Sequence, residues 1–181
     1  MTKPAQLIKE VENARNSFIK SCKNLSPLQY QFKIALEKWS ILEVAEHIVW
    51  AERAGVVGMW KVLEERKHGA AYWAGENPNE GLSIEEVVAK TWKPKEKVPD
   101  VARPRWGGAL NFWLSSLDSC KFTLMKLGEA LEGENAEKLI YPHPISGPLN
   151  ITQRLQFLRF HLNRHQNQIE NIKSHPHFPS S

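Results

Sequence analysis

The chain has 181 residues, which argues for one domain and against a two-lobed enzyme, because domains run to roughly 100 to 200 residues. Hydrophobic residues make up 41% and charged residues 24%, as in a globular protein that buries a core. The net charge of +4 is small beside the clustered charge of nucleic-acid-binding proteins, so nucleic acid is not an expected partner.

The first predicted element is an amphipathic helix. Apolar residues from Leu7 to Cys22 recur at three- and four-residue steps, the spacing of one helix face. A longer second helix is predicted from Ser40, which forms the S-x-x-E pattern of a capping box with Glu43. Its apolar pattern continues through the following turns, and Gly69 is the expected stop.

A long crossover is predicted over residues 70–107, where prolines and glycines recur and only one short helix, capped by Ser83, is expected. A third long helix follows, with apolar residues in alternating three- and four-residue steps from Leu110 to Leu131. A fourth runs from an Asn150 cap to about residue 174. Together these elements predict an all-α fold: a four-helix bundle with a long crossover between its second and third helices, as a single domain over residues 1–181.

Three of the seven histidines could meet inside such a bundle. His161 and His165 lie one turn apart on the fourth helix, and His165 occupies a position otherwise held by Ile and Leu. Such a pair also arises by chance, and a buried histidine that hydrogen-bonds a neighbour is the structural alternative. His47 on the second helix favours ligation, because three unpartnered buried imidazoles would be costly, whereas a metal ion uses all three lone pairs.

Three other residues bear on the chemistry of this site. Leu162 follows His161 where zinc proteases of the H-E-x-x-H type carry glutamate, so the pair brings no built-in base. Glu43, one turn before His47, is a candidate base or orienting residue, although its cap role explains it equally well. Trp106, at the start of the third helix, is the candidate aromatic wall of a cofactor or substrate pocket.

The remaining features concern compartment and partners. The basic run at 93–97 could touch phosphates, but a solvated loop is the expected reading because no nucleic-acid motif accompanies it. Cys22 and Cys120 are far apart, so neither a disulfide framework nor a thiolate zinc site is expected. The sequence has no long apolar stretch and begins without a signal-peptide pattern, so a cytoplasmic protein that does not span a membrane is expected.

Three short motifs occur in order along the chain: Trp39-Ser40-x-x-Glu43-x-x-x-His47, then His143-Pro144-x-x-Gly147-Pro148-Leu149, then His161-x-x-x-His165. In these motifs, in its helix order and in its crossover, the chain resembles the DinB-like (YfiT-like) superfamily of metalloproteins over nearly its whole length. The resemblance implies a four-helix bundle, frequently a homodimer, with a three-histidine site for a divalent metal, usually zinc or nickel. It assigns the ligands to His47, His161 and His165.

The resemblance also suggests a reaction class. Characterised relatives include bacillithiol S-transferases and mycothiol-dependent enzymes, in which the metal is thought to activate the thiol of a small cofactor. The expectation is therefore a metalloenzyme that activates a low-molecular-weight thiol or a water toward a small-molecule substrate, with thiol S-transfer slightly favoured. A metal-dependent hydrolase is one alternative, and a non-catalytic bundle with a structural or sensory metal is another.

Overall fold

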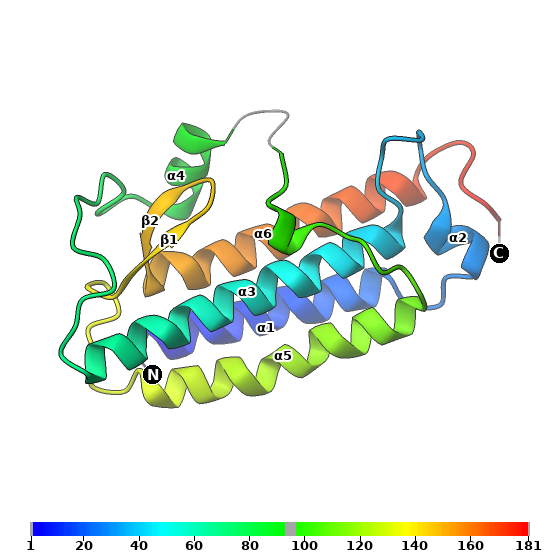
Figure 1. The fold of residues 1–181 in the computed structure, drawn as a ribbon. Coiled ribbons are helices and arrows are strands. Elements are labelled where there is room, and N and C mark those ends of the chain that lie inside the picture. The colour runs from blue at the N-terminus through cyan, green and yellow to red at the C-terminus, as the bar shows by residue number, and fades with distance from the viewer. Residues whose placement is uncertain (1, 93–96, 181) are drawn as a thin grey trace.

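Four long helices form the body of the protein in a computed structural model that describes residues 2–92 and 97–180. They pack as a bundle (Figure 1), so the predicted fold class is confirmed. Each of the four was predicted from apolar spacing, with ends within a few residues of those found. The long helices are α1 (Lys3–Ser21), α3 (Ile41–Lys67), α5 (Leu110–Ala130) and α6 (Ile151–Lys173).

Short elements connect and cover the bundle. Between α3 and α5 the crossover carries a helix and a single 3-10 turn, and its predicted basic run lies mostly outside the described residues, at 93–96. Between α5 and α6 the chain forms a hairpin. The short elements are α2 (Pro27–Gln31), α4 (Ile84–Thr91), η1 (Asp100–Ala102), β1 (Ile140–His143) and β2 (Gly147–Asn150).

Capping boxes set the starts of the two helices that later prove to carry the site. At α3, the backbone N–H of Glu43 donates to Ser40 Oγ at 3.3 Å, and the N–H of Ser40 donates to Glu43 Oε2 at 2.8 Å. At α6, Asn150 and Gln153 exchange the same pair of bonds. Each box satisfies backbone donors that a helix start leaves free, which explains why these signals were readable in the sequence.

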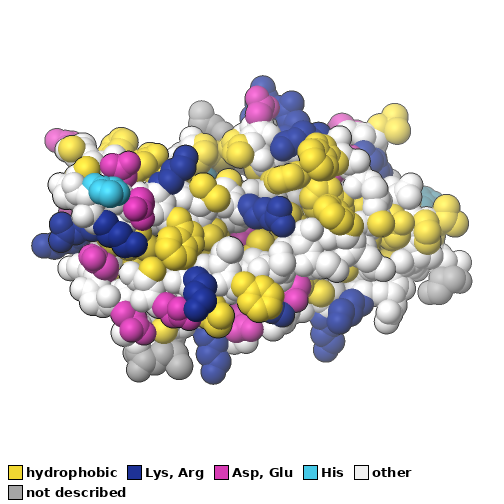
Figure 2. Space-filling view, turned by 60° about the horizontal axis from the view of Figure 1, so that its bottom comes forward, with side chains coloured by type: hydrophobic (Ala, Val, Ile, Leu, Met, Phe, Trp, Pro, Cys, Tyr) yellow, Lys and Arg dark blue, Asp and Glu magenta, His cyan; other side chains and the backbone are white. Residues whose placement is uncertain are grey.

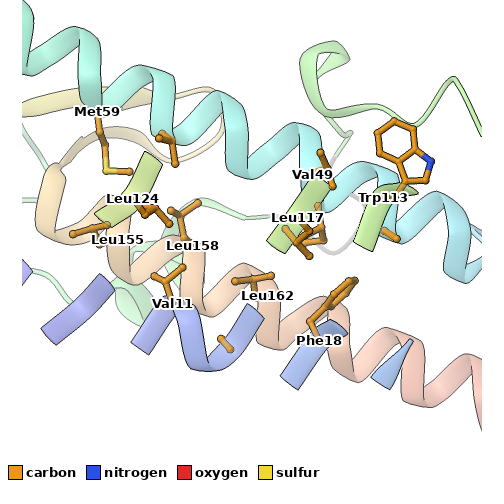
Figure 3. Close-up of a cluster of buried hydrophobic side chains, with 14 of the residues drawn as sticks. Val11, Phe18, Val49, Met59, Trp113, Leu117, Leu124, Leu155, Leu158 and Leu162 are labelled. Atoms are coloured by element: carbon orange, nitrogen blue, oxygen red, sulfur yellow. The ribbon is translucent and has the colours of Figure 1, made fainter. Parts of the chain in front are cut away.

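The core lies where the four helices face one another. Figure 3 shows side chains from all four pointing inward, among them Val11 of α1, Met59 of α3, Leu124 of α5 and Leu158 of α6. Each of these is at most 5% exposed. The apolar faces predicted from the spacing of the sequence therefore form one continuous core.

The hairpin that covers the bundle next to α3 and α6 was not predicted. The sequence at 140–150 reads as a loop because Pro142 and Pro148 lack backbone donors, yet these two prolines face each other in an antiparallel pair. Asn79 holds the hairpin by donating from Nδ2 to the carbonyls of Ser146 (2.8 Å) and Pro148 (2.9 Å). This anchoring fixes a wall above the bundle (Figure 1).

The surface is mixed in character. In Figure 2, which turns the lower side of the bundle forward, separate hydrophobic side chains lie between basic and acidic ones. Among the described residues, no helix has the length and apolar character needed to cross a membrane.

Candidate metal centre

His47 of α3 meets His161 and His165 of α6 in the bundle, as the sequence predicted. The Nε2 atoms of His47 and His161 lie 3.2 Å apart, and those of His161 and His165 lie 3.1 Å apart. One ligand atom from each of the three lies within 4.8 Å of the others. In a tetrahedral zinc site with Zn–N bonds of 2.0–2.1 Å, neighbouring nitrogens are about 3.3 Å apart. The spacing of the cluster therefore fits a divalent ion.

The second ring nitrogens show which atoms carry protons. His47 Nδ1 lies 2.7 Å from the carbonyl oxygen of Ala102, and His165 Nδ1 lies 2.8 Å from Oε1 of Gln168. Both partners are acceptors, so in the neutral rings the protons sit on Nδ1 and the two Nε2 atoms present bare lone pairs. A single proton on His161 Nε2 can satisfy only one of them. A cation can accept all three lone pairs, which makes the donor set suited to a metal.

Burial keeps these rings neutral. The three side chains are at most 7% exposed. Burial lowers the pKa of His47 to about 4 and that of His165 to about 3, and it holds the pKa of His161 well below its usual range, with the neighbouring histidines adding to the effect. Neutral imidazole is the form that binds metal, so the ligands need not lose protons at neutral pH.

Glu46, the residue before His47, attaches the crossover to α3. Its fully buried carboxylate accepts backbone N–H bonds from Arg105 (2.8 Å), Trp106 (2.9 Å) and Gly107 (2.9 Å) and an indole N–H bond from Trp50 (3.2 Å). Burial alone would raise the pKa of Glu46, but these four donors outweigh it and the pKa is lowered. The attached segment also supplies the carbonyl that orients His47, so Glu46 positions a ligand from a distance.

Replacing Glu46 with glutamine is expected to weaken both the fold and the metal centre. The amide turns one acceptor into a donor that faces buried N–H groups, which costs about 2 kcal/mol of unfolding free energy. Because the segment holding His47 is loosened, zinc affinity is expected to fall about tenfold, the size of effect seen for residues that orient ligands. Urea unfolding and zinc titration measure the two effects.

Glu43→Gln is the matched control, since Glu43 lies one turn earlier on the same helix. We expect it to cost less than about 1 kcal/mol, because it loses only a cap and an ion pair near the surface. Zinc affinity should not change. An unchanged stability in Glu46→Gln, or an equal loss in both variants, would contradict the anchoring role.

A cavity of about 400 Å³ adjoins the three histidines. Its volume falls in the range of small-molecule sites, roughly 300 to 1,000 Å³. The walls come from α3, α6, the hairpin and the crossover at 98–102, and most are apolar or aromatic. The large apolar and aromatic lining residues include Trp39, Trp92, Tyr141, Ile145, Phe157 and Leu158.

Two predicted site residues lie away from the cavity. Glu43 directs its carboxylate to the backbone of Ser40 and to Lys33 Nζ, which is 2.8 Å away. Its role as a base stays a prediction that no hydrogen bond between Glu43 and the three histidines supports among the described residues. Trp106 was expected to line the pocket, but it is 68% exposed and packs edge-on against Trp50, with ring centroids 5.6 Å apart. The Glu46 anchor holds its backbone and leaves its side chain outside.

Other aromatic residues form the wall instead. The Trp39 ring lies 4.9 Å from that of His47, and Trp92, which the sequence reasoning passed over, follows α4. His143, from the second of the three sequence motifs, accepts N–H bonds at Nδ1 from Ile145 (3.2 Å) and Ser146 (3.0 Å) and lines the cavity. Its proton is therefore on Nε2.

Two further functional candidates were missed by sequence reasoning. Glu46 left little local signal, because the three backbone groups that it binds are about 60 residues away in the chain and only Trp50 is near it. Arg154 also lines the cavity, and it sits seven residues before His161. That spacing puts both residues on one face of α6, and it is the sequence signal from which Arg154 could have been placed near the histidines.

Comparisons of sequence and of structure relate this chain to known proteins. The DinB superfamily model matches residues 10–169. The uncharacterized protein YuaE of Bacillus subtilis (strain 168) is 29% identical over 157 residues, 83% of this chain and 87% of that protein. The crystal structure of TT2238, a four-helix bundle protein, has a TM-score of 0.57 at 17% identity, with 93% of this chain and 98% of that chain covered. This last likeness concerns the fold alone.

Proposed function

Because the chain belongs to the DinB superfamily, we propose that it is a metalloenzyme in which His47, His161 and His165 hold a divalent ion. The proposed substrate is a small molecule that reacts in the adjoining cavity. One observation carries the proposal: two bare Nε2 atoms flank the Nε2 of His161, at 3.2 Å and 3.1 Å, in a buried place where one proton cannot serve both. Three neutral nitrogens suit zinc or nickel.

The chain's residues would divide the work between holding the ion and shaping the cavity. A bound ion would lower the pKa of a thiol or a water that takes its remaining coordination position. Ala102 and Gln168 fix the rings of His47 and His165, so the ligands are oriented before the metal arrives. The aromatic walls exclude bulk water, and the neutral His143 offers an Nε2–H as a hydrogen-bond donor toward the cavity.

We favour an external low-molecular-weight thiol over a thiol of the protein. Both cysteines are buried, and neither lines the cavity. Burial raises the pKa of Cys22 to about 12 and that of Cys120 to about 11, so both stay protonated and unreactive at neutral pH. A sulfur nucleophile would therefore come from a second small molecule, as in thiol S-transfer.

Thiol alkylation tests the proposal with mercaptoethanol and monobromobimane as probes. In this reaction a sulfur–carbon bond forms, bromide leaves and the thiol proton goes to solvent. We expect the zinc-loaded protein to accelerate the reaction at neutral pH and the metal-free protein and His161→Ala not to. With cobalt in place of zinc, the thiol should produce a sulfur-to-cobalt absorption band.

Other outcomes separate the alternatives. If the thiol gives no cobalt absorption band while the metal-loaded protein hydrolyses p-nitrophenyl acetate, the thiol S-transfer hypothesis is overturned in favour of a hydrolase. If the metal binds and neither reaction is accelerated, the catalytic proposal fails and a structural or sensory metal remains.

A homodimer and a cytoplasmic location complete the proposal. The support for a dimer is the superfamily resemblance together with large apolar side chains on α5 that are half or more exposed, namely Phe112, Phe122 and Met125. A second copy packed on this face would remove them from water. The cavity and its three histidines belong to one chain, so the proposed chemistry does not depend on this contact.

A further inference from the structure

Arg154 is a buried cation with no carboxylate partner among the residues that the structure describes. It lies on α6, is 5% exposed and lines the cavity. Among the described residues, no carboxylate forms an ion pair with it, and its Nη1 atom is buried with no hydrogen-bond partner. Burying a charge in this way is costly unless something compensates it. An uncompensated guanidinium beside a cavity indicates a place where an anion binds.

The surroundings of Arg154 leave room for its guanidinium. The group lies over the ring of Tyr141, 5.2 Å from the ring centroid. A Cβ added at Gly55 of α3 would lie 3.5 Å from its Nη2 atom, an ordinary van der Waals contact, so α3 comes close to the group. Nearby, Gly58 admits the Tyr141 ring, which would lie 2.3 Å from an added Cβ. The Tyr141 ring, which packs against Gly58, and the α3 backbone at Gly55 therefore form a recess for the group.

The distance along α6 from Arg154 to the histidines indicates how long a bound molecule would be. Arg154 and His161 are seven residues apart on one helix, which is about 10 Å along the axis. Apolar side chains occupy the stretch between the two ends, including Ala51, Phe157 and Leu158. The cavity therefore has a polar group at each end and an apolar middle.

The charge of the cavity is positive. Arg154 lies inside it, the exposed Arg164 and Lys38 stand at its edge, and Glu37, also exposed, is the one acidic side chain among the described lining residues. The buried histidines are neutral at neutral pH and add no charge. Within the recess one guanidinium faces the cavity, so it balances a single negative charge.

We propose that Arg154 is an anion subsite that binds a carboxylate of the small molecule in the cavity. The reacting atom of that molecule lies at the three histidines, the first of which follows Arg154 by about 10 Å along the helix axis. The planar guanidinium suits a carboxylate, which it can bind through two parallel N–H bonds. A dianionic group would leave one charge unbalanced in the apolar cavity. The substrate class is thus an acid with an apolar body between its carboxylate and its reactive end. This inference rests on the proposed function, because the proposed function places the reacting atom at the three histidines.

The test uses the metal-free protein at neutral pH, with octanoate and octanamide as probes in calorimetric titrations. The two probes match in length and apolar area and differ in charge. The parent protein is expected to bind octanoate at least about tenfold more tightly, a difference of about 1.4 kcal/mol. Arg154→Gln should lose this preference and keep its affinity for octanamide, which also reports that the cavity has kept its shape.

Arg159→Gln is the matched control. Arg159 lies on the same helix but outside the cavity, where it pairs with Glu85 at 2.9 Å. We expect this variant to keep the preference for octanoate. No preference in the parent, or a preference that persists in Arg154→Gln, would overturn the subsite. Because the metal is absent, these outcomes are independent of zinc binding, which is measured separately.

A second measurement separates a binding role from a structural one. A structural arginine would lower stability when replaced, whereas an unpaired buried charge opposes folding. Arg154→Met is therefore expected to unfold at the same or a higher urea concentration than the parent. A clear drop in that midpoint would show that Arg154 supports the fold and would overturn its assignment as a site kept for a ligand.

Discussion

Alanine in place of His161 is expected to reduce zinc affinity by more than about a hundredfold. Loss of an orienting residue alone costs tenfold to a hundredfold, and loss of a ligand costs more. His161 should show the largest effect of the three, because its Nε2 lies between those of His47 and His165. Competition titrations with a zinc-binding dye measure the affinities of the parent and the three alanine variants.

Two other histidines provide controls for this experiment. His143→Ala removes a half-buried ring from the wall of the same cavity, and His68→Ala removes one that is 73% exposed at the end of α3. Neither belongs to the described metal cluster, so neither should change the affinity by more than a fewfold. Circular dichroism of each variant confirms the fold. Equal affinity in all three ligand variants and the parent would show that the ligands are wrongly assigned.

Breaking the buried ion pair between α1 and α3 is expected to have the largest effect on stability. Arg15 and Glu52 are 1% and 2% exposed, and Arg15 Nε donates to Glu52 Oε1 at 3.1 Å. Arg15→Met leaves the Glu52 carboxyl group buried in the core without its partner, which costs about 3 to 5 kcal/mol of unfolding free energy. Urea unfolding followed by circular dichroism measures the loss.

The double variant Arg15→Met, Glu52→Leu distinguishes the loss of the whole ion pair from the loss of one partner. Because it removes both charges and fills the space with apolar groups, its stability should return close to that of the parent. Lys126→Met is the exposed control: Lys126 is 62% exposed and pairs with Glu129, so its loss should cost less than about 1 kcal/mol. A single Arg15 variant as stable as this control would refute the expectation.

The sequence allowed prediction of features that depend on neighbouring residues. The capping pairs at Ser40 and Asn150 and the spacing of apolar side chains located the long helices, since both act within a few turns. The convergence of the three histidines followed from helix faces in the same way. The hairpin escaped because its facing prolines, Pro142 and Pro148, resemble a loop when they are considered one at a time.

Features that depend on distant contacts could not be predicted. Trp106 looked like a pocket wall from its place at a helix start, but Glu46, 60 residues earlier, binds its backbone and leaves the ring outside. Glu43 looked like a base because it is one turn from His47, yet Lys33 and the cap occupy its oxygens. The position of the Trp106 ring depends on tertiary packing, which sequence spacing does not encode, whereas the cap that Glu43 forms with Ser40 was readable in the sequence.

The three-histidine cluster and Arg154 line the same cavity, and each imposes a cost on the fold. Three closely spaced imidazoles and an unpaired guanidinium are buried in a bundle that an apolar core already holds together. We propose that a ligand compensates each of them, a metal ion in the first case and a carboxylate in the second.

X-ray absorption at the zinc edge of the zinc-loaded protein tests the central claim most directly. After unbound metal is removed by gel filtration, we predict a zinc ion with three imidazole nitrogens at about 2.0–2.1 Å and a light atom in a further position. Their loss in His161→Ala would identify the site. A protein that retains no zinc, or a spectrum with sulfur ligands near about 2.3 Å, would contradict a three-histidine centre.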